Sequence, residues 1–316
     1  MTVTTFRGRR RQQAPGQSDV PIHTAHRGLR RRNLTGWLFI LPLVAGIAAF
    51  QLVPVLISVY ASLTDWDGIT SPGFVGMDNY VALTGDPFFW QTLKNTAVFT
   101  CGVIPLTLVV ALFLAILCNR KGIRGKAFFR TAYFTPFITS MVAISLVWTQ
   151  FYAPRGVLNG LLDAVGVSGP SWLASSTWAL PAVIIVAVWQ GVGYPMVILL
   201  AGLQGIPGSL YEAARLDGAN AWRQFTHVTI PMLTPQIFFV LITQFVTSFQ
   251  VFAIIYVMTR GGPGNATNVY IYYLYQNAFT YGRLGYASAM AWILFVLIAV
   301  LTAIQWRLQK RWVFYE

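Results

Sequence analysis

Residues 284–308 read LGYASAMAWILFVLIAVLTAIQWRL, an apolar stretch whose only charged residue, Arg307, stands near its end. The hydrocarbon core of a bilayer is about 30 Å thick, so roughly 20 apolar residues in a helix are enough to cross it. An arginine in the last turn can extend its long side chain to the membrane interface. This stretch therefore predicts a transmembrane helix.

Five further stretches have the same character, and none of the six contains Asp, Glu or Lys. The five are residues 36–63, 96–118, 128–152, 178–203 and 232–258. Prolines interrupt several of them, namely Pro42, Pro54, Pro105, Pro136, Pro181 and Pro195. Neighbouring helices can satisfy the carbonyls that a proline frees, so kinks are tolerated within a membrane. We expect an all-α integral membrane protein with six transmembrane helices, kinked around a cavity.

The overall composition agrees with a membrane protein. The 316 residues are 56% hydrophobic and only 10% charged, with a mean hydropathy of +0.59, whereas soluble domains carry about 25% charged residues. The formal net charge of +13 does not indicate nucleic-acid binding, because the basic residues alternate with apolar stretches instead of forming one basic face. The composition therefore excludes an ordinary soluble enzyme, a disordered chain and a nucleic-acid partner.

Histidines and cysteines show no spacing typical of metal ligands. His23 and His26 lie in the arginine-rich N-terminal segment, and His227 stands alone. Cys101 and Cys118 would be about 25 Å apart along one helix, which is too far for a disulfide. We expect no bound metal and no catalytic residue.

Lys and Arg gather in alternate connections between the apolar stretches, and cytoplasmic connections are enriched in them. The basic segments are residues 1–33, with eight arginines, residues 119–130, residues 205–231 and residues 307–311. We therefore expect both termini to be cytoplasmic in a bacterial-type inner membrane. Residues 1–33 are predicted to form a disordered basic tail, and residues 34–316 the six-span domain. Residues 36–63 are about twice as long as the apolar part of a signal peptide, so we expect them to be retained.

The connection at residues 205–231 reads GIPGSLYEAARLDGANAWRQFTHVTIP. Ser209, with Glu212 three residues later, has the pattern of a capping box, which predicts that a helix begins at Ser209. Gly218 is expected to end this helix after barely two turns, and Asn220 to cap a second short helix. Four residues of this connection are small and would let another protein approach the backbone closely: Ala213, Ala214, Gly218 and Ala219.

The same connection resembles the EAA loop of ABC-importer permeases. The matching residues are Glu212-Ala213-Ala214, then Gly218 after three residues, then Val228-Thr229-Ile230-Pro231 after nine more, where that family usually ends in Ile-x-Leu-Pro. In that family the first helix of the loop inserts into a cleft of a cytoplasmic ATPase. From the residues alone, an alternative remains open: a surface loop with clear helix-start and helix-end signals. The resemblance implies that the coupling residues are Glu212, Ala213, Ala214, Arg215, Asp217 and Gly218.

Three other stretches resemble the carbohydrate-uptake permeases of the maltose type. They are FVGMDNY at 74–80, YVMTRGGP at 256–263 and GYASA at 285–289. The resemblance covers about residues 35–310 and implies the type I ABC importer permease fold. One departure is that Ala253, not the acidic residue often found in the family, follows the aromatic Phe252.

This resemblance implies a permease subunit of a binding-protein-dependent ABC importer, which forms half of the path of a sugar or oligosaccharide by ATP-driven alternating access. The implied partners are a second permease subunit, two cytoplasmic ATP-binding subunits, an extracytoplasmic solute-binding protein and membrane lipid. The chain contains no G-x-x-x-x-G-K-[ST] phosphate loop, so we expect ATP hydrolysis on a separate subunit. ATP and Mg²⁺ would then be bound by the ATPase, and this chain would be non-catalytic and bind no cofactor.

A neutral sugar needs hydrogen-bond partners and aromatic faces, and the fourth and fifth apolar stretches contain both. Buried amides are costly without partners, so they should face the interior rather than lipid. They can equally bond neighbouring helices, and the second permease subunit can supply most of the site. The candidates for the substrate path are Trp189, Gln190, Tyr194, Gln244, Ser248, Phe249 and Gln250.

Two other functions are considered. An ion-coupled secondary transporter usually keeps a titratable group near the bilayer midplane and often contains internal repeats, and the sequence shows neither. A membrane glycosyltransferase would use Asp65 and Asp67 to hold a metal and a lipid-linked sugar phosphate on the outer face. The simpler interpretation of this pair is an interfacial turn beside Trp66.

Overall fold

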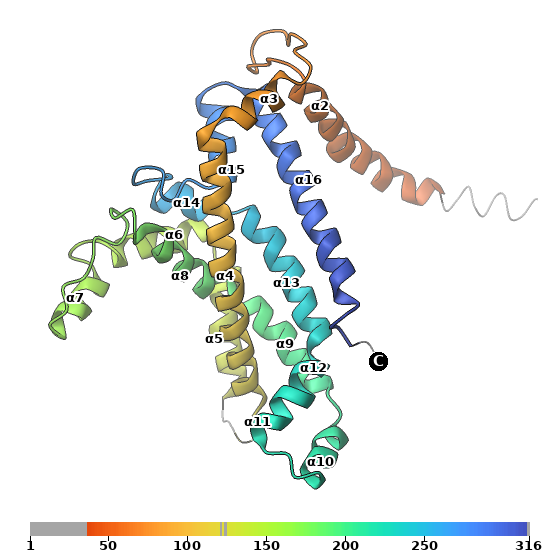
Figure 1. Ribbon diagram of the computed structural model, residues 1–316, viewed down its shortest axis with the longest axis vertical. Coiled ribbons are helices and arrows are strands. Elements are labelled where there is room, and N and C mark those ends of the chain that lie inside the picture. The colour runs from red at the N-terminus through yellow and green to blue at the C-terminus, as the bar shows by residue number, and fades with distance from the viewer. Residues whose placement is uncertain (1–36, 121, 123–124, 315–316) are drawn as a thin grey trace, which may run out of the picture. The chain divides into compact units, whose positions relative to one another are not determined.

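The computed structural model describes residues 37–120, 122 and 125–314 (Figure 1). In these ranges the regular structure is helical, apart from one isolated bridge between Thr64 and Phe74. The described residues divide into two compact units, with the boundary between Ile57 and Ser58. The predicted basic tail at 1–33 lies outside the described residues.

The first apolar stretch forms one helical span, Trp37–Ser62, within a residue of the predicted bounds at each end. It contains a π-helical turn, η1 (Ala48–Leu52), and ends with α2 (Val53–Ser62). After it, α3 (Asp78–Gly85) precedes the second long helix.

Two further spans are long single helices, α4 (Pro87–Asn119) and α16 (Leu284–Gln309). The helix α4 begins at Pro87, although the apolar pattern predicted a span from residue 96. A polar cap explains the earlier start, because the Asp86 carboxylate accepts a 2.8 Å hydrogen bond from the Phe88 amide. Proline is also favourable in the first turn, where its missing N–H would have no helical partner.

Three spans are broken pairs of helices. The pair α5 (Lys126–Ile138) and α6 (Met141–Phe151) bends by 98°, and α8 (Ala179–Gly191) and α9 (Gly193–Gly205) bend by 47°. The segment Ala221–Met232 meets α13 (Thr234–Phe249) at 63°. Counting each bent pair as one span gives up to six spans in the described part of the chain.

Three predicted spans are therefore not continuous helices. Residues 178–203 break at Val192, between α8 and α9. Residues 128–152 break at Thr139, whose ψ of 147° is extended and whose hydroxyl donates to the Thr135 carbonyl. Residues 232–258 break after Phe249, and α14 (Ala253–Met258) begins a separate short helix. Apolar composition marks all three stretches, but it does not reveal where the backbone leaves the helix.

The helix α4 is the centre of the packing in the larger unit, where it contacts α8, α9 and α13. Buried side chains of α4 such as Phe99, Ala111 and Leu114 belong to two of its apolar cores. The helix α9 approaches α5 very closely at Gly193. A Cβ atom at this glycine would lie 2.6 Å from the Tyr133 carbonyl oxygen, so only glycine allows the approach.

The two ends of the larger unit carry different elements (Figure 1). One end holds α10 (Gly208–Leu216), α11 (Ala221–Gln224), η2 (Phe225–Thr229) and α12 (Ile230–Met232). The other holds α3, α15 (Tyr270–Tyr275) and η3 (Gln276–Thr280), while α7 (Val157–Ala164) belongs to a side loop.

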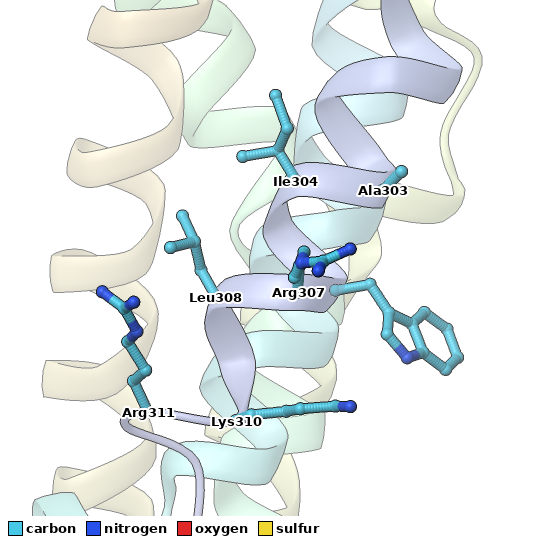
Figure 2. Close-up of a pocket in the computed structure, with 7 residues that line it drawn as sticks. Ala303, Ile304, Arg307, Leu308, Lys310 and Arg311 are labelled. Carbon is cyan, nitrogen blue, oxygen red and sulfur yellow. The ribbon is translucent and has the colours of Figure 1, made fainter.

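The last turns of α16 are basic. Figure 2 shows Arg307, Lys310 and Arg311 extending from this end of the helix, and all three are exposed. The chain then returns to α13, where the Phe314 amide donates a 3.0 Å hydrogen bond to the Thr234 hydroxyl. Basic residues of the last helix therefore lie near the start of α13, which follows directly on the segment at 205–231.

Candidate functional site

A cavity of about 520 Å³ lies where the broken helices change direction. Its walls come from both sides of the α5–α6 and α8–α9 breaks and from the residues between α13 and α14. Broken helices at membrane depth typically surround a substrate site, because irregular backbone is tolerated only where protein or a cavity covers it. The polar and aromatic lining residues are Phe99, Phe137, Gln190, Tyr194, Thr243, Gln244, Thr247, Ser248, Gln250 and Phe252.

Amides and hydroxyls supply the polar groups of this cavity, and none of its described lining residues is charged. The hydroxyls of Thr243 and Thr247 donate to carbonyls one turn earlier in α13, each at 3.0 Å. Their oxygens therefore remain available as acceptors. The Gln244 amide adds donors, so the wall suits a neutral ligand that both donates and accepts hydrogen bonds.

Aromatic rings form a flat part of the wall. The rings of Phe137 and Tyr194 stack with centroids 5.3 Å apart and planes only 16° apart. Phe137 comes from the end of α5, and Tyr194 from the first turn of α9. The breaks in the two spans thus bring together rings that lie 57 residues apart in the chain.

Five predicted path residues line this cavity: Gln190, Tyr194, Gln244, Ser248 and Gln250. Gln190 also donates a 3.4 Å hydrogen bond to the Phe137 carbonyl and so links α8 to the end of α5. The sequence had left open that such amides bond neighbouring helices, and Gln190 does so.

The other two candidates lie elsewhere. Trp189 packs edge-on against Trp148 at 5.5 Å. Phe249 is buried in another apolar core, where its ring lies 4.7 Å from Phe245. Consecutive residues of a helix point about 100° apart, so each neighbour of a lining residue faces a different direction.

Five of the polar and aromatic lining residues were not among the candidates: Phe99, Phe137, Thr243, Thr247 and Phe252. Thr243 and Thr247 stand one turn apart on the face that includes Gln244 and Gln250, so an i, i+4 search for polar residues would have found them. No local signal indicates Phe137, because its position depends on the 98° bend between α5 and α6.

The segment at 205–231 forms two short helices as predicted, but its first helix begins differently. It starts at Gly208 with Pro207 as the N-cap and no side-chain cap bond, so the predicted Ser209–Glu212 capping box is absent. Proline fixes φ near the value of −60° that Pro207 has in its extended N-cap conformation. The Asn220 side chain caps the second helix, as expected, by accepting a 2.9 Å hydrogen bond from the Arg223 amide.

Gly218 closes the first helix in a Schellman motif. Its amide donates to the Arg215 carbonyl at 3.0 Å, and the Ala219 amide donates to the Ala214 carbonyl at 2.9 Å. The motif needs a left-handed residue, and Gly218 has a φ of +75°. A sharp turn thus follows α10.

The coupling candidates lie on the surface of this turn. Glu212, Ala213, Arg215, Asp217 and Gly218 are exposed, and Ala214 is half-buried.

Two apolar side chains beside them are also open to solvent, Leu216 at 90% and Trp222 at 70% exposure. The Tyr211 hydroxyl and the Thr229 hydroxyl are 3.0 Å apart and tie α10 to η2. A firmly held helix with exposed apolar residues is the surface expected of a docking element.

The carboxylates of Asp65 and Asp67 are used within their own loop. Asp65 accepts from the Gly73 amide at 2.7 Å, and Asp67 accepts from the Ile69 and Thr70 amides. These backbone hydrogen bonds lower the pKa of Asp67. The described residues contain no group of three potential metal ligands, and this pair acts as a turn former.

A helical membrane domain with an uncharged cavity at its helix breaks and an exposed helical segment at one end has the architecture of a transport permease. The family model described as "Binding-protein-dependent transport system inner membrane component" matches residues 107–313. The chain belongs to this family.

Similar proteins agree with this assignment. The chain is 40% identical over 295 residues to the probable ABC transporter permease protein YesP of Bacillus subtilis, covering 92% of this chain and 95% of that one. It is 37% identical over 288 residues to the lactose transport system permease protein LacF of Rhizobium radiobacter, covering 89% and 96%.

A solved structure shows the same fold. It is a chain of a bacterial ABC transporter involved in the import of the acidic polysaccharide alginate, with a TM-score of 0.77, 22% identity, and coverage of 90% of this chain and 98% of that one.

These findings confirm the predicted type I importer permease fold and the prediction of an ABC transporter permease. The chain is an integral inner-membrane, non-catalytic subunit, and ATP hydrolysis belongs to a separate ATPase. The secondary-transporter and glycosyltransferase alternatives are therefore wrong.

Proposed function

We propose that this permease forms half of the import path for a neutral sugar or small oligosaccharide. The observation that carries the proposal is the cavity at the helix breaks, whose described walls present amides, hydroxyls and stacked rings without any charge. Its volume of about 520 Å³ falls within the range of small-molecule sites, about 300–1,000 Å³. The similarity to LacF, a lactose transport permease, supports a sugar as the substrate.

The absence of charge among the described lining residues favours neutral over acidic saccharides. An acidic sugar that leaves water needs a compensating positive group or several strong donors near its carboxylate. The similarity to the alginate importer, at 22% identity, concerns the fold and carries no argument about charge.

In the proposed mechanism, different partners bind the two ends of the domain. An extracytoplasmic binding protein delivers the sugar on the side of α3 and α15, and a second permease subunit completes the cavity. Two cytoplasmic ATPase subunits, which hold ATP and Mg²⁺, bind the segment at 205–231 and move α10 as they close. This motion reaches the cavity through α9 and α13, because the segment joins the ends of both helices.

The orientation rests on the distribution of basic residues. Arg215 and Arg223 lie in the segment itself. Arg307 lies in the last turn of α16, and Lys310 and Arg311 follow this helix at the end shown in Figure 2. Positive residues are retained on the cytoplasmic side, so both termini belong there.

Uptake in the native host tests the proposal. Cells with and without this permease would receive radiolabelled lactose, maltose, cellobiose and raffinose, with digalacturonate as the acidic counterpart. We expect uptake of at least one neutral sugar, and not of digalacturonate, to require the permease. Loss of only the acidic uptake would contradict the neutral-substrate proposal, and unchanged uptake of every probe would contradict a role in sugar import.

A further inference from the structure

A group of contacting aromatic rings, here called the aromatic strip, leads away from the cavity toward the end that carries α15. It begins at Phe252, which lines the cavity, and continues through Tyr256, Tyr275 and Phe279. Phe252, Tyr256 and Tyr275 contact one another, with ring centroids 5.4 Å apart between Phe252 and Tyr256, 5.6 Å between Tyr256 and Tyr275, and 5.0 Å between Phe252 and Tyr275. Phe279 extends the group, with its ring 5.2 Å from that of Tyr275. The rings of the strip are therefore in contact all the way from the cavity wall to the surface.

One side of the strip is packed and the other is open. Tyr272 lies behind it, only 7% exposed, with its ring 6.3 Å from Phe252 and 6.5 Å from Tyr275. In contrast, Tyr256 is 42% exposed and Phe279 is 72% exposed. The buried ring holds the row in place, while its outer members keep surface available to a ligand.

The chemistry of the strip matches a saccharide. Pyranose rings have apolar C–H faces that stack on aromatic rings, and hydroxyl rims that exchange hydrogen bonds with phenol groups. Tyr256 and Tyr275 provide both in one side chain. Neighbouring rings of similar chemistry also offer a moving ligand nearly equivalent contacts, so no single position traps it.

We propose that the aromatic strip is a saccharide-binding lane through which sugar released on the outer side reaches the cavity. This inference rests on the proposed function, because it requires a sugar substrate and α15 on the outer side. Contact with the second permease subunit is the competing explanation for exposed aromatic residues, which are common at interfaces. A lane requires continuity with the cavity wall, and Phe252 provides it. The second subunit completes the same cavity, so the experiment is designed to separate the lane from the interface.

The test uses the complete transporter in proteoliposomes, with its second permease, ATPase and binding protein. The probe is whichever of lactose, maltose, cellobiose or raffinose loses uptake when the permease is deleted from the host. For Tyr256→Ser and Tyr275→Ser, both sugar uptake and ATP hydrolysis are measured. Without the aromatic contacts, more of the released sugar would diffuse back to the outer side. We therefore expect the amount of ATP hydrolysed per sugar imported to rise about threefold or more, which corresponds to the free energy of one aromatic contact.

Controls separate the lane from a structural role. Tyr256→Phe and Tyr275→Phe keep the rings and should stay near the native ratio. Tyr281→Ser removes a tyrosine that is 55% exposed near the end of η3, and should leave the ratio unchanged.

Each remaining outcome overturns the lane. Parallel loss of uptake and ATP hydrolysis, with less second permease co-purifying, would assign the strip to the subunit interface. An unchanged ratio in both serine variants would also contradict the lane, while the sugar-import function would stand. If none of the four sugars depends on the permease, the proposed function fails and the lane with it.

Discussion

The Asp86 carboxylate accepts a 2.7 Å hydrogen bond from the hydroxyl of Tyr286, a residue 200 positions later in the chain. The same oxygen accepts a 2.6 Å bond from Tyr273, and the other carboxylate oxygen caps α4. One half-buried carboxylate therefore joins the starts of α4 and α16 to α15. This arrangement fixes the end of the domain where we place sugar entry.

Asp86→Asn should destabilise the permease. The amide loses the charge that strengthens the tyrosine hydrogen bonds, at a cost of about 1 kcal/mol for a partly exposed group. The thermal midpoint in nanodiscs should fall, and a double-mutant cycle checks the cause. In a Tyr273→Phe, Tyr286→Phe background the same substitution should cost much less, because its two partners are gone. An equal cost in both backgrounds would contradict the arrangement.

The same carboxylate predicts a pH dependence. Burial raises the pKa of Asp86, but the hydrogen bonds from Tyr273, Tyr286 and the Phe88 amide outweigh it and bring the pKa below 3.8. Burial and Asp86 raise the pKa of Tyr273 to about 12, so this donor keeps its proton at neutral pH. A lowered carboxyl pKa stabilises the fold above the unfolded value, and that stability is lost as the pH falls through the folded value.

The thermal midpoint of the native protein, followed from pH 7 to pH 3, should therefore show a decrease below about pH 4 that Asp86→Asn reduces. Identical slopes for the two proteins would show that Asp86 does not contribute to acid sensitivity.

Gly218→Val should uncouple transport. A β-branched residue at a φ of +75° costs about 1–2 kcal/mol, so the turn after α10 would relax and shift its exposed face. We expect membrane insertion to be normal and ATPase co-purification and sugar uptake to fall, with Gly218→Asn less affected because Asn tolerates this conformation. Gly205→Val is the control, since Gly205 has open space around it and no positive φ. Normal uptake in Gly218→Val would count against the coupling role.

Gln244→Leu should lower sugar uptake about threefold to tenfold, the value of one hydrogen bond to a neutral ligand. The matched control is Gln150→Leu, because Gln150 is an exposed amide at the end of α6 that does not line the cavity. Initial uptake rates, normalised to the amount of inserted permease, make the comparison. Equal effects of the two substitutions would remove the cavity from the substrate path.

Single cysteines should report the orientation. With Cys101 and Cys118 replaced by Ser, Leu216→Cys and Ile69→Cys place thiols at sites that are 90% and 93% exposed. We expect a membrane-impermeant maleimide to label position 69 in intact spheroplasts and position 216 only in inverted vesicles. The reverse pattern would place the segment at 205–231 outside and contradict both coupling and orientation.

The class of the molecule and the ends of its short helices could be predicted from the sequence. The length of each apolar stretch located the membrane spans, because each polar residue buried in lipid adds its own unfavourable free energy. Gly218 and Asn220 marked the turn between α10 and α11, since a left-handed glycine and a side-chain cap act within a few residues. The pattern around Glu212 also identified the family, which the comparisons confirm.

The positions of the helix breaks, and the cavity that they enclose, depend on how the helices pack in three dimensions. Phe137 lines the cavity, whereas Phe249 is buried in another core. Their neighbouring residues in the sequence do not distinguish them, because the direction of each side chain depends on the rotation of its helix and, for Phe137, on the 98° bend. The contacts of Asp86 with Tyr273 and Tyr286 likewise join residues about 200 positions apart. Such pairings result from the packing of whole helices, whose free energy depends on many distant side chains at once.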